Sequence, residues 1–159
     1  MANLFILNKV KATAHYVDIV APATVTNGNI VVLGTQVSAD KTYAVAANAA
    51  VTDTGMVIVC NPNLPYAAET VENDTVIATG EIVRARVVEL GDVESYPVAN
   101  ITATVALAVG KFVVPKATAL KMECVNAVAG TESLVYVLEE LFTKAGVAMA
   151  KLRCIKAQV

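Results

Sequence analysis

The stretch Asn27–Thr35 reads NGNIVVLGT, and the stretch Val109–Ala117 reads VGKFVVPKA. Both contain a glycine, then a polar or charged residue, a bulky apolar residue and two valines. Glycine supplies the backbone conformation of a tight turn, and a continuous apolar run suits a strand that is covered on both faces. This order therefore predicts a glycine-led turn that enters a buried strand, used at two places in the chain.

The two stretches are followed by a second similarity. With Gly28 aligned to Gly110, the run GMVIV at 55–59 falls near the run SLVYV at 133–137. One interpretation is an internal repeat, and the other is coincidence, because short matches arise easily in a chain so rich in valine. The repeat predicts an N-terminal arm or strand at 1–20, a first β lobe at 21–95 and a second β lobe at 96–159.

Short apolar and β-branched runs, separated by Gly, Asn, Asp and Pro, continue along the whole chain. This spacing predicts a mostly β fold, one compact chain of two small barrel- or sandwich-like lobes with at most one or two short helices. The segment 133–146 also fits a helical stripe; we expect a strand at 133–139 followed by a loop, and 45–51 could hold a helical turn. The predicted strands lie at 3–10, 15–21, 29–34, 42–47, 56–60, 81–90, 101–108, 111–115, 120–125, 133–139 and 149–157.

The composition points to an assembled protein. Apolar residues make up 56% of the chain and charged residues only 16%, whereas about 25% charged residues is usual in globular chains. So few charges cannot cover the surface evenly, and exposed apolar patches mark partner surfaces. We therefore expect the protein to form a homo-oligomer or to bind a larger assembly.

Several partners and compartments are not expected. The net charge is −2 and the three arginines, Arg84, Arg86 and Arg153, form no basic stripe, so a nucleic-acid partner is not expected. The start of the chain lacks the pattern of a secretory signal, and the longest uncharged stretch, 95–110, is too short and too polar to span a membrane. Its alternating Thr and Val residues instead favour a strand.

The cysteines and the only histidine suggest no metal site. Cys60, Cys124 and Cys154 each lie in an apolar run without paired ligand spacing, so we expect buried, reduced thiols. A zinc site that combines them with His15 has the wrong separations. No catalytic residue, cofactor site or metal site is predicted from these residues.

Two acidic segments allow a chemical interpretation and a structural one. Asp53-Thr54-Gly55 resembles the signature of aspartic proteases, in which two such aspartates share a proton across a two-fold axis, so a homodimeric protease is an alternative function. The same triplet is a favourable turn sequence, and Met56 replaces the small residue that usually follows.

Glu89, Asp92 and Glu94 in VELGDVES could hold a cation, but we expect a solvated acidic turn here, as for 69–74.

The order of segments resembles that of the head decoration, or auxiliary capsid, proteins of tailed bacteriophages. The resemblance lies in the layout, from NGNIVVLG through GMVIVCNPNLPYAAE and RARVVELGDVESYPVANI to LAVGKFVVPKA and MAKLRCIKA. It implies a non-enzymatic virion protein, made in the host cytoplasm, that binds the outer surface of the major capsid protein lattice as a homo-oligomer, most often a trimer. A tail-tube or fibre-base subunit is a further structural alternative.

The N-terminal run NLFILNKV is the candidate contact with the capsid. Leu4, Phe5, Ile6 and Leu7 are apolar on both faces of a strand, which calls for cover on both sides. The sheet edge of a partner could supply that cover by strand addition. The alternative is an inner strand of the chain's own fold.

Overall fold

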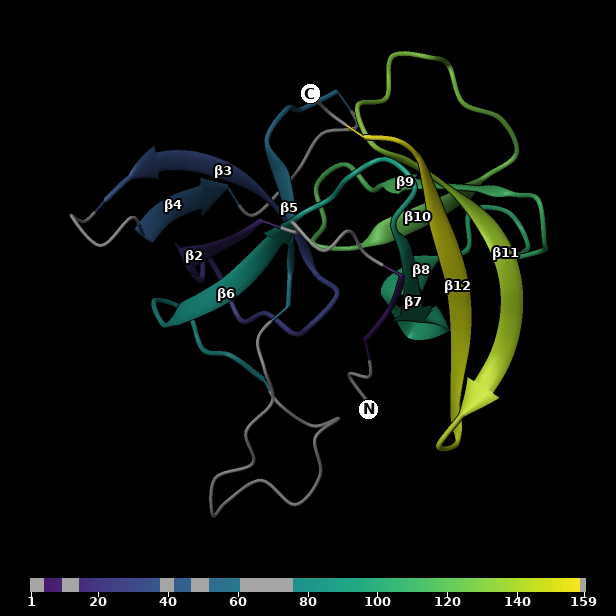
Figure 1. Cartoon of the computed structure of the whole chain (residues 1–159), viewed down its shortest axis with the longest axis horizontal. Coiled ribbons are helices and arrows are strands. Elements are labelled where there is room, and N and C mark those ends of the chain that lie inside the picture. The colour runs from purple at the N-terminus through teal and green to yellow at the C-terminus, as the bar shows by residue number, and fades with distance from the viewer. Residues whose placement is uncertain (1–4, 10–14, 38–41, 47–51, 61–75, 158–159) are drawn as a thin grey trace.

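Strands form almost all the regular structure of the protein (Figure 1). The computed structural model describes residues 5–9, 15–37, 42–46, 52–60 and 76–157. Within these ranges the fold is mostly β, with two sheets and one short 3₁₀ helix, η2 (Val98–Asn100), which confirms the predicted fold class. No helix long and apolar enough to cross a membrane occurs in these ranges.

The first sheet is a closed five-stranded barrel with the order β2-β4-β3-β5-β6. Its pairs are antiparallel except for β2 with β4, which run parallel. Branched and small apolar side chains such as Ile19, Val31 and Val83 fill its interior. Its strands are β2 (Tyr16–Val20), β3 (Ile30–Gln36), β4 (Thr42–Ala46), β5 (Met56–Val59) and β6 (Ile82–Val87).

The second sheet has seven strands in the order β1-β7-β12-β11-β9-β10-β8. The long hairpin of β11 and β12 closes through Ala145 and Gly146, both with positive φ, as a tight two-residue hairpin turn requires. Its strands are β1 (Ile6–Lys9), β7 (Val93–Pro97), β8 (Ile101–Thr102), β9 (Phe112–Pro115), β10 (Met122–Val125), β11 (Val135–Lys144) and β12 (Val147–Lys156).

Strand β5 joins the two cores and explains the unbroken apolar run MVIV. All four of its residues are buried. Val57 and Val59 point into the barrel, whereas Met56 and Ile58 belong to the core cluster of the seven-stranded sheet. Successive side chains of a strand point to opposite faces, so a strand between two cores must be apolar at every position.

The repetition noticed in the sequence corresponds to repeated backbone geometry. In the barrel, the Gly28 N–H donates to the Val59 carbonyl (2.9 Å), and the Val59 N–H donates to the Asn29 carbonyl (2.8 Å). Gly28 has φ +87°, as the third residue of a type II turn requires. The turn thus leads β3 into antiparallel pairing with β5.

The second sheet repeats this arrangement. The Gly110 N–H donates to the Leu138 carbonyl (2.8 Å), the Leu138 N–H donates to the Lys111 carbonyl (2.8 Å), and Gly110 has φ +85°. Val59 therefore corresponds to Leu138, so GMVIV matches 134–138, one residue later than the sequence alignment placed it. The same pair of hydrogen bonds recurs at Gly80 with Ala21 and Glu81, and at Gly91 with Cys154 and Asp92.

Three strand predictions were wrong in detail. The segment 81–90 breaks after Val87 into a turn, and VESYP at 93–97 then forms β7, which was not predicted. Only the first two residues of the predicted strand 101–108 are paired. The strand predicted at 133–139 instead runs from Val135 to Lys144, because β12 pairs with it to the tip of the hairpin.

The chain passes from one sheet to the other at 88–92. Strands β2 to β6 make up the barrel, and every strand after this connection belongs to the seven-stranded sheet. The segment 1–20 contributes to both sheets, with β1 beside β7 and β2 in the barrel. The possible helical turn at 45–51 lies mostly outside the described residues.

Candidate functional site

The predicted contact segment forms an edge of the chain's own sheet. Ile6 and Leu7 lie in β1, which pairs antiparallel with β7. The Phe5 ring packs edge-on against Tyr96, with the ring centroids 4.9 Å apart. Leu4 lies outside the described residues. The segment is therefore a strand of this fold in the isolated chain, and its role as a contact with a partner stays a prediction.

As an edge strand, β1 still presents a surface for a partner. It is the first strand in the order of the seven-stranded sheet, whereas the barrel is closed. Because side chains alternate along a strand, Phe5 and Leu7 face the core, and Ile6 lies on the opposite face beside Ser95. An edge strand can add a partner's strand through its backbone groups.

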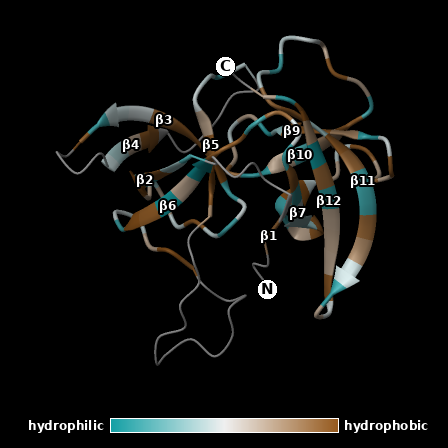
Figure 2. Cartoon of the chain, viewed as in Figure 1, coloured by the Kyte–Doolittle hydropathy of each residue, from teal (hydrophilic) through white to brown (hydrophobic). Residues whose placement is uncertain are grey.

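Apolar side chains are exposed over both sheets. Figure 2 shows brown, hydrophobic positions on strands at the periphery of the molecule as well as in its centre. Ile82 and Val109 are each 66% exposed. The large apolar residues that are exposed in the described part of the chain are Tyr16, Val37, Val76, Ile82, Leu90, Val109, Leu141 and Ile155.

The β11–β12 hairpin borders an apolar hollow. In Figure 1 the hairpin curves along one side of the molecule and its tip extends past the other strands. A hollow of about 300 Å³ lies between its outer part and the segment around η2. Its described lining residues are Val98, Leu107, Leu141, Phe142, Thr143, Ala148 and Met149.

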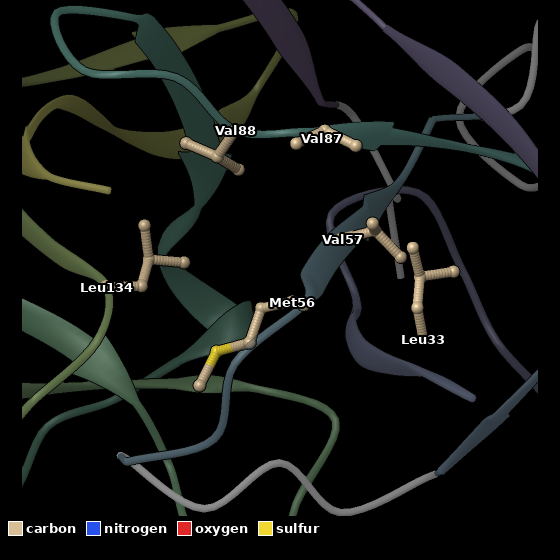
Figure 3. Close-up of a pocket in the computed structure, with 7 residues that line it drawn as sticks. Leu33, Met56, Val57, Val87, Val88 and Leu134 are labelled. Atoms are coloured by element: carbon tan, nitrogen blue, oxygen red, sulfur yellow. The ribbon is translucent and has the colours of Figure 1, made fainter. Parts of the chain in front are cut away.

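A second apolar cavity, of about 210 Å³, lies where the barrel meets the seven-stranded sheet. Leu33, Val57 and Val87 line it from the barrel strands, and Leu134 closes it just before β11 (Figure 3). Met56, Val88 and Gly55 complete the described lining. None of these residues carries a polar side chain, so the described walls can pack against an apolar group but supply no acid, base or nucleophile.

The acidic turn expected to be solvated is instead part of a buried ion cluster, so that prediction was wrong. Asp92 is 1% exposed and Glu94 is fully buried. Arg86 of β6, also fully buried, pairs with both: its Nη1 lies 2.5 Å from Asp92 Oδ2, and its Nη2 contacts Glu94 Oε1. A buried guanidinium needs such counterions, because an unpaired charge in an apolar core is very unfavourable.

Two tyrosines complete this cluster. The hydroxyl groups of Tyr136 and Tyr96 donate to Glu94 Oε2 at 2.8 and 3.1 Å. The backbone N–H of Glu89 donates to Asp92 Oδ2 at 2.9 Å, which closes the turn between β6 and β7. Burial raises the pKa of both tyrosines, so their hydroxyls stay protonated and remain donors.

The ion cluster was missed although the sequence carries a signal for it. Glu94 and Tyr96 are two residues apart in one strand, so their side chains lie on the same face. Arg86 lies among apolar residues shortly before the turn that contains Gly91 and Asp92. Arg86 comes from the barrel, whereas Glu94 and Tyr136 come from the other sheet. The cluster therefore joins the two halves of the molecule electrostatically.

Asp53-Thr54-Gly55 leads into β5. Gly55 has φ +77°, and its carbonyl accepts the Leu33 N–H at 2.9 Å. The Asp53 carbonyl accepts a hydrogen bond from the Ser133 hydroxyl, which links the barrel to the segment before β11. The backbone of the triplet thus has a structural role in the protomer.

The three cysteines are all described, and none lies in a disulfide in this structure. Cys124 and Cys154 are buried, while Cys60 is only half-buried. Burial raises the pKa of all three thiols, that of Cys154 to about 12. Among the described residues, no three His, Cys, Asp or Glu side chains are grouped so that they could hold a metal ion.

Comparison of the chain with protein-family models, curated proteins and solved structures found no match.

Proposed function

We propose that this chain is a non-enzymatic structural protein of a virion that binds the outer surface of the major capsid protein lattice. The observation that carries the proposal is the apolar surface: large apolar side chains are exposed on both sheets, and among the described strands β1 lies at an edge of the seven-stranded sheet. Exposed apolar patches usually mark interaction surfaces. The layout of the sequence, which resembles that of phage head decoration proteins, gives this surface its expected partner.

The architecture suits a protein that braces a lattice. Strand β5 of the barrel packs side chains into both cores, and the Arg86 ion cluster holds the two halves together, so a force on one half passes to the other. A lattice repeats each binding site many times, so many modest contacts add up to a large stabilisation. Such contacts depend on shape and apolar area and need no reactive group.

Strand β1 is the part that we expect to contact the capsid. Its core face is used by Phe5 on Tyr96, whereas Ile6 lies on the other face and is half-buried. Addition of a capsid strand at this edge would cover Ile6 and satisfy the backbone groups of the edge. Ile6 is therefore the residue to change, because Phe5 also holds the chain's own fold.

The experiment is to produce virus-like particles from the major capsid protein of the virus that carries this chain and to measure how much of the chain purifies with them. Wild type should be present on the particles. Ile6→Lys should show strongly reduced occupancy, with circular dichroism confirming that it remains folded. A chain lacking residues 2–8 also loses Phe5: if it stays folded it should show the same loss, and if it does not fold, β1 is required by the chain's own fold. Ala117→Lys adds the same charge at an exposed loop position and should bind like wild type.

Absence of the wild-type chain from the particles would contradict the proposal. Equal occupancy of wild type and the variants would retain capsid binding but exclude β1 as the contact. Open polymers of the purified chain, seen by electron microscopy, would instead favour a tail-tube subunit.

A further inference from the structure

The outer face of strands β2 and β6 is a mixed apolar and charged surface. Asp18 lies directly opposite Arg84, and Val20 lies directly opposite Ile82. Side chains directly opposite each other share a face, and Tyr16 lies two residues from Asp18. We call Tyr16, Asp18, Val20, Ile82 and Arg84 the β2–β6 face; the residues between them, such as Ile19 and Val83, fill the barrel.

This face has the composition of a contact surface. Ile82 is 66% exposed and Tyr16 is 47% exposed. In Figure 2 the beginning of β6 is brown, and a teal stretch follows it towards β5. The Arg84 guanidinium lies 5.8 Å from the centre of the Tyr16 ring. Tyrosine and arginine flanked by aliphatic side chains are typical of the residues that dominate protein interfaces.

The β2–β6 face carries one positive and one negative charge, so it is complementary in charge to the same face of a second copy. The side chains of Arg84 and Asp18 are about half exposed, and Arg84 Nε lies 3.9 Å from Asp18 Oδ1. The face therefore presents one cation and one anion side by side, and the half-exposed side chains of both can reach a partner.

We propose that the β2–β6 face binds the same face of a second copy of this chain. A two-fold axis that runs between β2 and β6, parallel to the strands, places β2 of one copy against β6 of the other at the same height. Arg84 then meets the partner's Asp18, and Ile82 meets the partner's Val20. This is an isologous contact, in which one patch is used twice.

Self-complementarity favours a second copy over a different protein. A partner of a single charge would meet a like charge at either Asp18 or Arg84, which is unfavourable. The face is small compared with the 1,200 Å² or so that stable interfaces bury, so the dimer should be weak and depend on concentration. The inference concerns self-association alone and does not depend on binding to a capsid.

The test uses a charge exchange between two copies. Asp18→Lys makes the face wholly positive, and Arg84→Glu makes it wholly negative. Each variant alone should dimerise about tenfold or more weakly than wild type in sedimentation velocity, because like charges then face each other. An equimolar mixture should dimerise again. Across the heterodimer, the lysine introduced in one copy would face the glutamate introduced in the other, and the remaining Arg84 would face the remaining Asp18.

Two further variants make the test decisive. Ile82→Ser removes exposed apolar area without disturbing the core, and it should weaken the dimer on its own. Arg153→Glu removes another half-exposed ion pair, with Glu139 on the seven-stranded sheet, and should dimerise like wild type. Circular dichroism shows that each variant is folded.

A wild-type chain that stays monomeric at high concentration, or that forms a trimer, would overturn the proposal. So would a mixture of the two charge variants that stays monomeric, because the ion pair would then act only within one chain. Binding of a different protein to this face without self-association would also overturn it.

Discussion

At the scale of single residues, the three thiols differ in how well the fold protects them. Cys124 and Cys154 are buried and Cys60 is half-buried. Burial raises the pKa of Cys154 from 9.0 to about 12. Only the thiolate reacts quickly, so the raised pKa lowers the reactive thiolate fraction of Cys154 near neutral pH.

We therefore expect native protein to react slowly with a thiol reagent, first at Cys60 and last at Cys154. Denatured protein should show three fast equivalents, one for each cysteine. The measurement is a time course of thiol titration with mass-spectrometric assignment. Fast labelling of Cys154 in native protein, or a disulfide found without reduction, would contradict the structure.

Asp53 contributes to the fold through its backbone, since its carbonyl accepts the Ser133 hydroxyl. Asp53→Asn keeps this carbonyl and the shape of the side chain. We expect the free energy of unfolding to stay within about 0.5 kcal/mol of wild type, because the amide keeps the backbone contact and the shape of the side chain. Urea denaturation measures this effect. A peptidase activity that the wild type shows and Asp53→Asn lacks would support the aspartic protease alternative instead.

At the scale of elements, the recurring unit is the type II turn that ends in a hydrogen-bonded strand pair. Gly110 has φ +85°, and a Cβ added there would meet no atom within 4 Å. Gly110→Ala should therefore lower the free energy of unfolding by about 1–2 kcal/mol, through backbone strain alone.

Gly28 provides the comparison for this prediction. It has the same backbone conformation, but a Cβ there would lie 3.4 Å from both Phe5 and Tyr96. Gly28→Ala should therefore be more destabilising than Gly110→Ala when both are measured by urea denaturation. Equal effects would show that Phe5 and Tyr96 move aside easily, and no effect in either variant would contradict the turn geometry.

At the scale of the whole molecule, the Arg86 cluster joins the barrel to the seven-stranded sheet. Arg86→Met would leave Asp92 and Glu94 buried without their cation, which should cost about 3–5 kcal/mol of the free energy of unfolding. The triple change Arg86→Met, Asp92→Asn and Glu94→Gln should cost less than the single change. The neutral amides can still accept hydrogen bonds from Glu89, Tyr96 and Tyr136 without an unpaired charge.

Urea denaturation monitored by circular dichroism measures the free energy of unfolding of both variants. A single transition in wild type would show that the two sheets unfold together. A cost below about 1 kcal/mol for Arg86→Met would indicate that the cluster is hydrated and does not hold the two halves together. A triple variant less stable than Arg86→Met would indicate that the charges of Asp92 and Glu94 have other partners.

The sequence by itself determined the fold class, the main strands and the glycine-led turns. These features depend on local rules: apolar β-branched runs favour strands, and a turn with positive φ favours glycine. The two similar glycine-led turns could be recognised for the same reason, since Gly28 and Gly110 each precede a strand that must be apolar. The alignment was one residue off beyond that point, because strand register is set by pairing and not by composition.

Only the tertiary structure decided where the charged residues and the edges lie. Asp92 and Glu94 look solvated in sequence because their counterion, Arg86, reaches them across the junction of the two sheets. Likewise β7 is buried although it contains Glu94 and Ser95, since β1 and β12 pair with its backbone and Arg86, Tyr96 and Tyr136 contact Glu94. Whether Phe5, Ile6 and Leu7 form an inner strand or an edge also depended on strand order, because pairing between distant segments leaves no local pattern in the sequence.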